Sequence, residues 1–241
     1  PFCNVYSSFM QRAYDSIIHD VALQKLNVIM CLDRAGLVGS DGATHHGVFD
    51  LAYMRCIPNI TIAAPRNEHE LRNLMFTVQQ AALGPFVIRY PRGKGYLIDW
   101  RNEMEATEIG KGECLKKGDK LAVVTIGVMA NPALEAIKKV EAGLDVRIGL
   151  YDMKFLKPLD THLLREIAGE YSQVITIEDG VINGGFGSAV LEYFADSNLE
   201  VKVRRMGVPD RFIEHGTPEE LYAEIGLDAD GIERVIREIV A

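Results

Sequence analysis

A glycine-rich segment at residues 33–47 holds the densest set of chemically capable side chains in this sequence. It reads Asp-Arg-Ala-Gly-Leu-Val-Gly-Ser-Asp-Gly-Ala-Thr-His-His-Gly, directly after the apolar run at residues 27–32. Glycine lets the backbone turn sharply and approach a ligand, while charged and imidazole groups supply binding and proton transfer. Ligand sites of open α/β sheets lie in loops that follow strands. We therefore expect a ligand site in this loop.

Two arginines near the ends of expected strands suit an anionic ligand. Arg34 lies in the glycine-rich loop, and Arg92 lies in the run Tyr-Pro-Arg-Gly at residues 90–93. A phosphate dianion is best matched by planar guanidinium groups, and glycine turns can add backbone N–H donors. From the residues alone a second interpretation stays open, in which both arginines are solvated or pair with Asp33 or Asp50.

Asp41, His45 and His46 invite two further interpretations, which the spacing does not favour. Two consecutive histidines rarely face one ion, and no cysteine or carboxylate stands at helical spacing to complete a tetrahedral site. Ser40 would complete the residue types of a hydrolase triad, but no nucleophile-elbow pattern accompanies it. We predict neither a metal site nor a hydrolase here.

Tyr6, Phe9 and Arg12 form a third group of candidates at the start of an amphipathic segment. An aromatic side chain on such a helix is by default a core residue, so Phe9 alone does not indicate a site. A rigid aromatic ring is also the side chain that stacks best on a flat heterocycle. The residues leave both interpretations open.

These candidates are set among alternating strand and helix patterns. The sequence predicts the strands 1–6, 27–32, 61–64, 86–90, 109–115, 121–126, 145–150, 174–177 and 200–206. It predicts helices at 7–24, 49–55, 67–82, 131–142, 161–171 and 184–196, and helices that begin near 217 and 228. Helix starts are indicated by the pairs Ser7-Ser8, Asn67 with Glu70, Asn131-Pro132 and Thr217 with Glu220. We predict an α/β protein with two three-layer α/β/α domains and mostly parallel sheets.

The periodicity fades between the two halves. Residues 96–108, around the single tryptophan Trp100, read as a linker between a first domain at 1–95 and a second at 109–241. Within the second domain, the run Gly184-Gly185-Phe186-Gly187 follows a strand and opens a helix. Its spacing is not that of a dinucleotide fingerprint, and Arg204-Arg205 stands where an acidic residue is needed. We expect close strand–helix packing there.

Composition excludes several classes of function. A net charge of -8 with no basic run argues against nucleic acid binding, and no stretch approaches the roughly 18 apolar residues that a membrane helix needs. The four cysteines show no metal or redox spacing, and we interpret them as buried free thiols of a cytoplasmic protein.

Three segments together resemble one family. Residues 6–15 (Tyr-Ser-Ser-Phe-Met-Gln-Arg-Ala-Tyr-Asp), the loop 33–47 and residues 89–93 (Arg-Tyr-Pro-Arg-Gly) resemble the 1-deoxy-D-xylulose-5-phosphate synthases of the transketolase superfamily. The resemblance runs over essentially the whole chain. It implies that residues 1–95 are the later part of a pyrimidine-binding domain. It also implies that 109–241 is the transketolase C-terminal domain, a mainly structural unit that packs between subunits.

The resemblance also implies roles for individual residues. Arg34 and Arg92 match the arginines that hold the phosphate of glyceraldehyde 3-phosphate. Asp41 and His45 match catalytic residues at the substrate hydroxyls and the nascent enamine, where an imidazole can donate a hydrogen bond or move a proton. His46 has no role beyond lining the loop.

The remaining candidates acquire roles in the same way. Phe9 matches the aromatic residue that stacks on the aminopyrimidine ring of the cofactor, and Tyr6 and Arg12 match residues that line the substrate pocket. No metal ligand is assigned within this chain. The cofactor-activating glutamate, the diphosphate-binding domain and its Mg²⁺ ligands are expected upstream.

The implied activity is that of a thiamine-diphosphate enzyme with Mg²⁺. Such an enzyme condenses pyruvate with glyceraldehyde 3-phosphate to 1-deoxy-D-xylulose 5-phosphate and CO₂, a precursor of isoprenoids, thiamine and pyridoxal. The resemblance implies a homodimer, inactivity of this chain without the N-terminal diphosphate-binding domain, and an open sheet edge with exposed apolar surface that favours self-association. The alternatives are a transketolase, the β subunit of a 2-oxo acid dehydrogenase, and a non-catalytic dimerisation or binding module.

Overall fold

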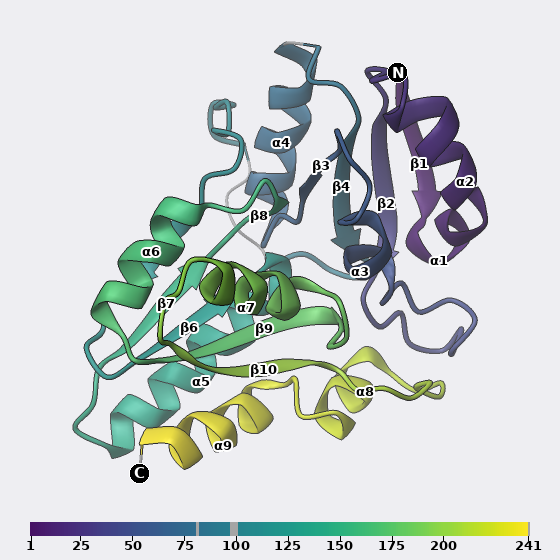
Figure 1. The fold of residues 1–241 in the computed structure, drawn as a ribbon. Coiled ribbons are helices and arrows are strands. Elements are labelled where there is room, and N and C mark those ends of the chain that lie inside the picture. Colours follow the sequence, from purple (N-terminus) through teal and green to yellow (C-terminus); the bar gives the residue numbers. More distant parts are fainter. Residues whose placement is uncertain (81, 97–100, 241) are drawn as a thin grey trace.

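Two five-stranded sheets organise the computed structural model, which describes residues 1–80, 82–96 and 101–240. The first sheet has the order β1-β2-β4-β3-β8, and the second has the order β10-β9-β6-β7-β5 (Figure 1). Neighbouring strands are parallel except in the pairs β3–β8 and β5–β7. The strands are β1 Phe2–Tyr6, β2 Ile29–Ala35, β3 Thr61–Ala63, β4 Phe86–Pro91, β5 Glu113–Lys116, β6 Leu121–Thr125, β7 Ile148–Asp152, β8 Phe155–Lys157, β9 Gln173–Val181 and β10 Lys202–Val208.

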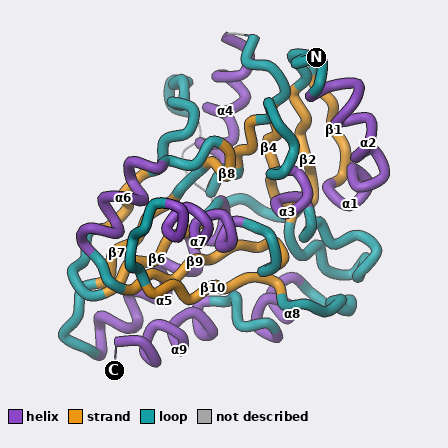
Figure 2. Tube along the Cα trace, in the orientation of Figure 1, coloured by secondary structure: helices purple, strands orange, loops and turns teal. Residues whose placement is uncertain are grey.

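Helices connect these strands and cover the sheets (Figure 2). They are α1 Ser7–Met10, the 3₁₀ turn η1 Gln11–Ala13, α2 Tyr14–Ser16, the π-helical η2 Ile17–Ala22, α3 Asp50–Met54, α4 Glu68–Gln80, the 3₁₀ turn η3 Gly127–Met129, α5 Ala130–Gly143, α6 Thr161–Glu170, α7 Phe186–Asp196, α8 Pro218–Glu224 and α9 Ala229–Val240. The predicted fold class, two α/β/α units with mostly parallel sheets, is confirmed. We call the part of the molecule built on the first sheet the first unit, and the part built on the second sheet the second unit.

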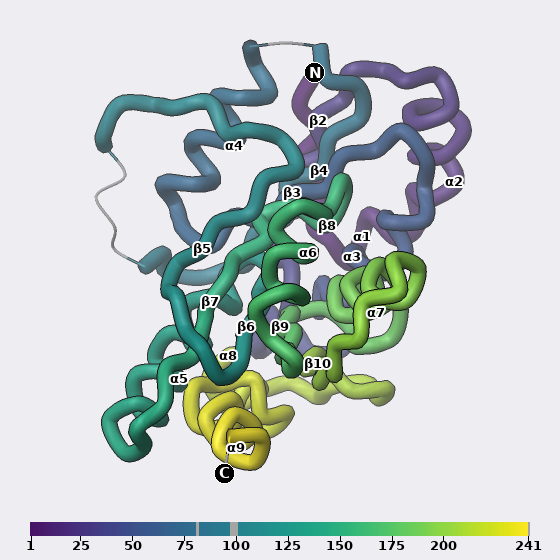
Figure 3. Tube along the Cα trace, turned by 60° about the vertical axis from the view of Figure 1, so that its left-hand side comes forward, coloured from purple at the N-terminus to yellow at the C-terminus, as the bar shows by residue number. Residues whose placement is uncertain are grey.

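Alternating side chains of β6 pack into a hydrophobic core on each face of the second sheet. Leu121 and Val123 belong to the core beneath α5 and α9, whereas Ala122 and Val124 belong to the core on the side of α6 and α7. Figure 3 shows α5 and α9 on one side of this sheet and α6 and α7 on the other. The α6–α7 core continues into the first sheet through Leu32, so the two units share one hydrophobic cluster.

Strand β8 joins the two units in a way that the sequence did not indicate. Residues 155–157 come from the second half of the chain, yet they pair antiparallel with β3 in the first sheet. Three residues are too few to show a strand period. Beside this junction, Lys157 donates to the carbonyls of Arg55 and Ile57 at the end of α3. The domain bounds stay predictions, and residues 97–100 of the expected linker, including Trp100, lie outside the described residues.

Two of the predicted helix starts differ from the structure. Tyr6 is the N-cap residue of α1, and Ser7 is buried instead of capping the helix. Asn131 lies inside α5, because the 3₁₀ turn η3 starts the helical path earlier than the proline pattern indicated. The predicted capping box of α8 is confirmed, since Thr217 and Glu220 each accept from the other's backbone N–H.

The open edge of the first sheet lies at β1, which pairs with β2 alone among the described strands. Phe2 on this strand is 43% exposed, so the expected apolar surface at a sheet edge is present. Cys3 is exposed on the same strand. The prediction of four buried thiols is therefore wrong: all four cysteines are free, but only Cys31, whose strand lies inside the sheet, is buried.

Candidate active site

The loop at residues 33–47 leaves the first sheet through a narrow neck. Strand β2 extends to Ala35, three residues beyond the predicted end, so Arg34 belongs to the strand and has a positive φ of 59°. Gly36 and Gly47 then exchange two backbone hydrogen bonds, each of 2.8 Å. Figure 1 shows the loop emerging at the end of β2 and lying between α1 and α8. The neck holds the two ends of the loop together.

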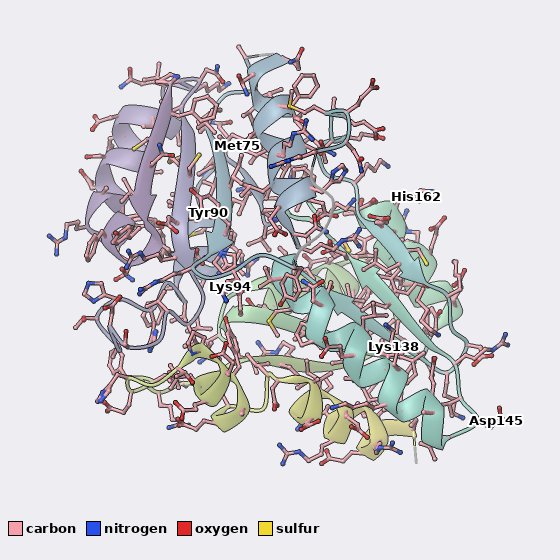
Figure 4. All side chains as sticks on the ribbon, turned by 180° about the vertical axis from the view of Figure 1, so that it is seen from behind. Met75, Tyr90, Lys94, Lys138, Asp145 and His162 are labelled. Atoms are coloured by element: carbon pink, nitrogen blue, oxygen red, sulfur yellow. The ribbon has the colours of Figure 1, made fainter. Side chains whose placement is uncertain are left out.

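Asp41 lies between the two arginines that the sequence singled out. Its Oδ2 accepts from Nη1 of Arg34 at 3.3 Å and from Nη1 of Arg92 at 2.9 Å. Arg92 directly follows β4, and Figure 4 shows Tyr90 and Lys94, which flank it in sequence, where the first sheet meets the second unit. We call Arg34, Asp41 and Arg92 the loop charge cluster. It carries one net positive charge.

The loop charge cluster is open to solvent. The side chains of Arg34, Asp41 and Arg92 are 23%, 36% and 47% exposed. Of the pairings that the sequence left open, Arg34 also approaches Asp33, with 3.9 Å between Nε and Oδ2. The two guanidinium groups are close enough to one carboxylate to converge on a single anion.

Three rings lie beside this cluster. Tyr6 and Phe9 are stacked with centroids 5.3 Å apart, and His45 meets Phe9 edge-on at 5.4 Å. The Arg34 guanidinium lies 3.9 Å above the Tyr6 ring. Phe9 is 41% exposed and is therefore not the core residue that its position on the helix would suggest. Arg12 is exposed on η1, and no contact among the described residues joins it to this group.

The two consecutive histidines point in different directions. His45, two residues before Gly47 of the neck, shares a 2.9 Å hydrogen bond with the Thr44 hydroxyl. His46 is buried, and its Nδ1 accepts from the Val38 N–H at 3.1 Å, so Nε2 carries the proton and donates to the Glu214 carbonyl at 3.2 Å. His46 thus pins the loop to the second unit. The part of the chain that the structure describes contains no cluster of three residues able to hold a metal ion.

A second charge cluster lies buried beneath the loop. Arg89 of β4 donates to Asp50 Oδ2 at 2.9 Å and to Asp179 Oδ1 at 2.5 Å. All three side chains are at most 3% exposed. Ser7 also donates to Asp50 Oδ2, at 3.0 Å. We call Asp50, Arg89 and Asp179 the buried charge cluster, and it joins the first unit to the second.

Burial governs the ionisation of this cluster. Burial raises the pKa of the Asp50 carboxyl, although the Arg89 guanidinium opposes the shift. Burial alone would lower the pKa of Arg89, but the adjacent Asp179 and Asp50 carboxylates raise it. Sequence reasoning missed this cluster, although residues 86–90, which include Arg89, were predicted as a strand. A signal existed, because a charged residue within the apolar strand β4 requires buried partners.

Tyr222 of α8 and Asp179 of β9 lie directly under the neck. The Leu37 N–H donates to the Tyr222 hydroxyl at 3.3 Å. A Cβ added at Gly36 would lie 2.6 Å from Asp179 Oδ2 and 2.7 Å from the Tyr222 hydroxyl, and Gly36 has a φ of 74°. Both the conformation and the space thus require glycine at this position.

The side chain of Glu178 lies at the N-terminus of α7, beside the glycine-rich run at residues 184–187. Its carboxylate accepts from the N–H groups of Phe186 at 2.7 Å and Gly187 at 2.8 Å. A Cβ at Gly185 would lie 2.1 Å from Glu178 Oε2, and one at Gly187 would lie 2.6 Å from Thr176 Oγ1. The predicted close strand–helix packing is confirmed. Burial raises the pKa of Glu178 to about 7 despite the two backbone donors.

Comparison with known families defines the class of the protein. Residues 1–96 match the family model described as the transketolase pyrimidine binding domain, and residues 110–232 match that of the transketolase C-terminal domain. The chain therefore belongs to the transketolase family of thiamine-diphosphate enzymes.

Within this family, the sequence is similar to 1-deoxy-D-xylulose-5-phosphate synthases. It is 61% identical over 238 residues to that of Parabacteroides distasonis and 58% identical over 236 residues to that of Bacteroides fragilis. These matches cover 99% and 98% of the present chain. The chain spans only 38% and 36% of the length of these two relatives.

Solved structures show the same architecture. A structure described as a split gene transketolase, inactive beta4 tetramer, matches with a TM-score of 0.88 and 31% identity, over 100% of this chain and 76% of that one. A transketolase from Pichia stipitis matches with a TM-score of 0.73, over 99% of this chain and 34% of its own length. At 17% identity the second likeness shows the fold alone.

Proposed function

We propose that this chain forms the acceptor-binding and pyrimidine-binding part of a 1-deoxy-D-xylulose-5-phosphate synthase. The whole enzyme would condense pyruvate with glyceraldehyde 3-phosphate, release CO₂ and form 1-deoxy-D-xylulose 5-phosphate. The observation that carries this proposal is the convergence of Arg34 and Arg92 on one point beside the exposed ring of Phe9. An anion site and a flat ring-binding surface lie side by side there.

Arg34 and Arg92 would hold the phosphate of the acceptor. Their Nη1 atoms both contact Asp41 Oδ2, so a phosphate group at this place could accept from both guanidinium groups. The Tyr6 ring under the Arg34 guanidinium fixes the plane of that group. Arg12, exposed on the neighbouring turn, would line the pocket from the outside.

Asp41 and His45 would act on the acceptor's polar atoms. In this state Asp41 occupies the two arginines, so an incoming phosphate must displace its carboxylate toward the hydroxyl groups of the acceptor. His45 carries a half-buried imidazole beside the Phe9 ring and can donate or accept a proton there. Asp41 therefore lies at the phosphate site, and His45 lies against the Phe9 ring beside it.

Phe9 fits the pyrimidine half of the cofactor. Its ring is 41% exposed and is supported by Tyr6 on one side, which leaves aromatic surface for a flat heterocycle. Thiamine diphosphate, when bound, supplies the carbanion chemistry. We propose that Mg²⁺ and the diphosphate are held by a diphosphate-binding domain of the whole enzyme, because the described residues present no carboxylate cluster for a metal.

We further propose a cytoplasmic homodimer as the working form, and that the 241-residue chain alone does not turn over. The structural relative whose description reads inactive beta4 tetramer supports self-association without activity in such a chain. The open edge at β1 is consistent with this proposal. No described helix is both long and apolar enough to cross a membrane.

The test uses a full-length enzyme that contains this chain, with thiamine diphosphate and Mg²⁺. We expect 1-deoxy-D-xylulose 5-phosphate from pyruvate and glyceraldehyde 3-phosphate, and no product from the 241-residue chain alone. Arg92→Ala should raise the KM for glyceraldehyde 3-phosphate about 100-fold and leave that for unphosphorylated glyceraldehyde nearly unchanged, because one charged hydrogen-bonding partner of the phosphate is lost.

Arg147→Ala serves as the matched control, because Arg147 pairs with Asp119 on the exposed surface of the second unit. Its kinetic constants should equal those of the wild type. Turnover of ribose 5-phosphate with a ketose phosphate donor, in place of pyruvate, would instead identify a transketolase. Equal use of phosphorylated and unphosphorylated acceptors by the wild type would contradict the assigned phosphate site.

A further inference from the structure

Residues Gly36, Leu37 and Gly39 of the loop at 33–47 rest on the second unit. Gly36 lies against Asp179 and Tyr222, and the Leu37 N–H donates to the Tyr222 hydroxyl. A Cβ at Gly39 would lie 3.0 Å from Pro218 Cδ and 3.1 Å from the Gly216 carbonyl oxygen. Segments more than 140 residues apart in sequence thus meet along the base of the loop.

Two successive amides of this base are held in different ways. The Val38 N–H donates to His46, a loop residue whose Nε2 donates in turn to the Glu214 carbonyl of the second unit. The Leu37 N–H instead donates to Tyr222, 185 residues away on α8. Leu37 is the first residue after the neck, and its side chain is 2% exposed in the core of the second unit. Tyr222 is therefore the one side chain among the described residues whose hydroxyl ties the neck of the loop to α8.

The buried charge cluster ends beside Tyr222, at the neck of the loop. Asp179 uses Oδ1 for Arg89, while its Oδ2 is buried without a hydrogen-bond partner and lies beside the same Gly36 position as the Tyr222 hydroxyl. Arg89 in turn holds Asp50, which accepts from Ser7. Buried polar contacts therefore run from α1, the helix that carries Phe9, as far as Asp179, which lies beside the neck of the loop.

We propose that Tyr222 is a positioning residue for the acceptor site. Its hydroxyl fixes the backbone at Leu37, and through the Gly36–Gly47 neck it holds Arg34 and Asp41 in the geometry that receives the acceptor phosphate. The second unit then contributes to the affinity for the acceptor without contacting it. The reason is that Arg34 and Asp41 are already in place, so they lose less conformational freedom when the acceptor binds. This inference rests on the proposed function.

The test compares Tyr222→Phe with Tyr171→Phe, a matched loss of a hydroxyl in the same unit. The Tyr171 hydroxyl accepts from the Gly118 N–H at 3.1 Å and from the Tyr151 hydroxyl at 3.1 Å, and donates to the Gly118 carbonyl at 2.8 Å. None of these partners belongs to the loop. In the 241-residue chain, hydrogen exchange at the Leu37 amide should become about tenfold faster in Tyr222→Phe only. Exchange at the Gly118 amide should rise in Tyr171→Phe only.

The full-length enzyme supplies the second measurement. In Tyr222→Phe the KM for glyceraldehyde 3-phosphate should rise about tenfold, while the KM for pyruvate stays within about twofold. If Tyr222 only stabilised the fold, the KM values for glyceraldehyde 3-phosphate and for pyruvate would both change, or neither would. Equal changes of the two KM values, or Leu37 exchange that matches the wild type, would overturn the inference.

A second variant covers the case in which Tyr222→Phe does not fold. Gly36→Ala places a methyl group against Asp179 Oδ2 and the Tyr222 hydroxyl, so it should produce the same exchange and KM changes from the other side of the contact. If the wild-type enzyme did not use these substrates, the proposed function would fall. Unchanged exchange at Leu37 in the Tyr222→Phe chain would still overturn the positioning role.

Discussion

The loop charge cluster and the buried charge cluster contain the same kinds of groups in opposite proportion. In the loop, one acid, Asp41, stands between Arg34 and Arg92, and the side chains are 23% to 47% exposed. Beneath it, one base, Arg89, stands between two acids, and the side chains are at most 3% exposed. The first cluster has a spare positive charge and access to solvent, so it can exchange its carboxylate for a ligand anion.

The buried cluster cannot make that exchange. Asp50 and Asp179 are held by Arg89 in a space without access for a ligand, and removal of Arg89 leaves two buried carboxyl groups without their partner. The comparison teaches that burial decides the role of a charge cluster. The exposed cluster is suited to binding, and the buried one to holding two units in one arrangement.

The largest effect should come from Arg89. Arg89→Met leaves Asp50 and Asp179 buried together without a counter-charge, so the free energy of unfolding should fall by about 3–5 kcal/mol. Urea denaturation followed by circular dichroism measures this change. Arg147→Met, in an exposed pair with Asp119, is the control and should cost about 0–1 kcal/mol. Similar losses in both variants would break the distinction between the clusters.

Glu178, next to Asp179 in the buried region, should make stability depend on pH. Its folded pKa of about 7 lies above the ordinary value of 4.5, so the folded state holds this proton more tightly than the unfolded state does. The contribution to stability is full below pH 4.5 and is lost as the pH rises to about 7. Relative to Glu178→Gln, the wild type should lose about 3 kcal/mol over this window.

Urea titrations from pH 4.5 to 8 test this prediction. Glu192→Gln is the control, because the hydrogen bond from Arg55 lowers the pKa of Glu192 and leaves it ionised throughout that range. The difference between wild type and Glu192→Gln should therefore be flat above about pH 6, where Glu192 is ionised in the unfolded state as well. A flat difference for Glu178→Gln as well would show that burial does not control ionisation beside the buried cluster.

The smallest effect should appear at Asp41. Asp41→Asn removes the carboxylate that occupies both arginines, so inorganic phosphate should bind about tenfold more tightly while turnover falls. Calorimetric titration of phosphate measures the affinity, and Asp119→Asn is the matched surface control. The gain should shrink at high salt because the cluster is partly exposed. Weaker phosphate binding in Asp41→Asn would mean that the arginines do not form the anion site.

Much of the fold was accessible to sequence reasoning because its signals are local. The apolar run that became β6 and the capping box at Thr217 each depend on residues a few positions apart. The short strand β8 was missed because it exists only through its pairing with β3. Exposure of Cys3 likewise depends on β1 being an edge strand, which no local pattern reveals.

The candidate site divides in the same way. Residue types and turn glycines in the loop at 33–47 indicated an anion and proton-transfer site, because that chemistry depends on the groups present. The pairing of the charges did not follow from the types. Asp50, a possible partner of Arg34 by sequence, is buried with Arg89, and Arg34 and Arg92 meet at Asp41.

By itself, then, the sequence determined two parallel α/β units and a polar loop at the end of a strand, since side-chain period, caps and turn residues act over short distances. Only the tertiary structure decided that Asp179 and Tyr222 of the second unit support that loop. Arg89 and Asp179 are 90 residues apart, and Leu37 and Tyr222 are 185 apart. Such contacts are set by how the two sheets pack, which no short stretch of sequence encodes.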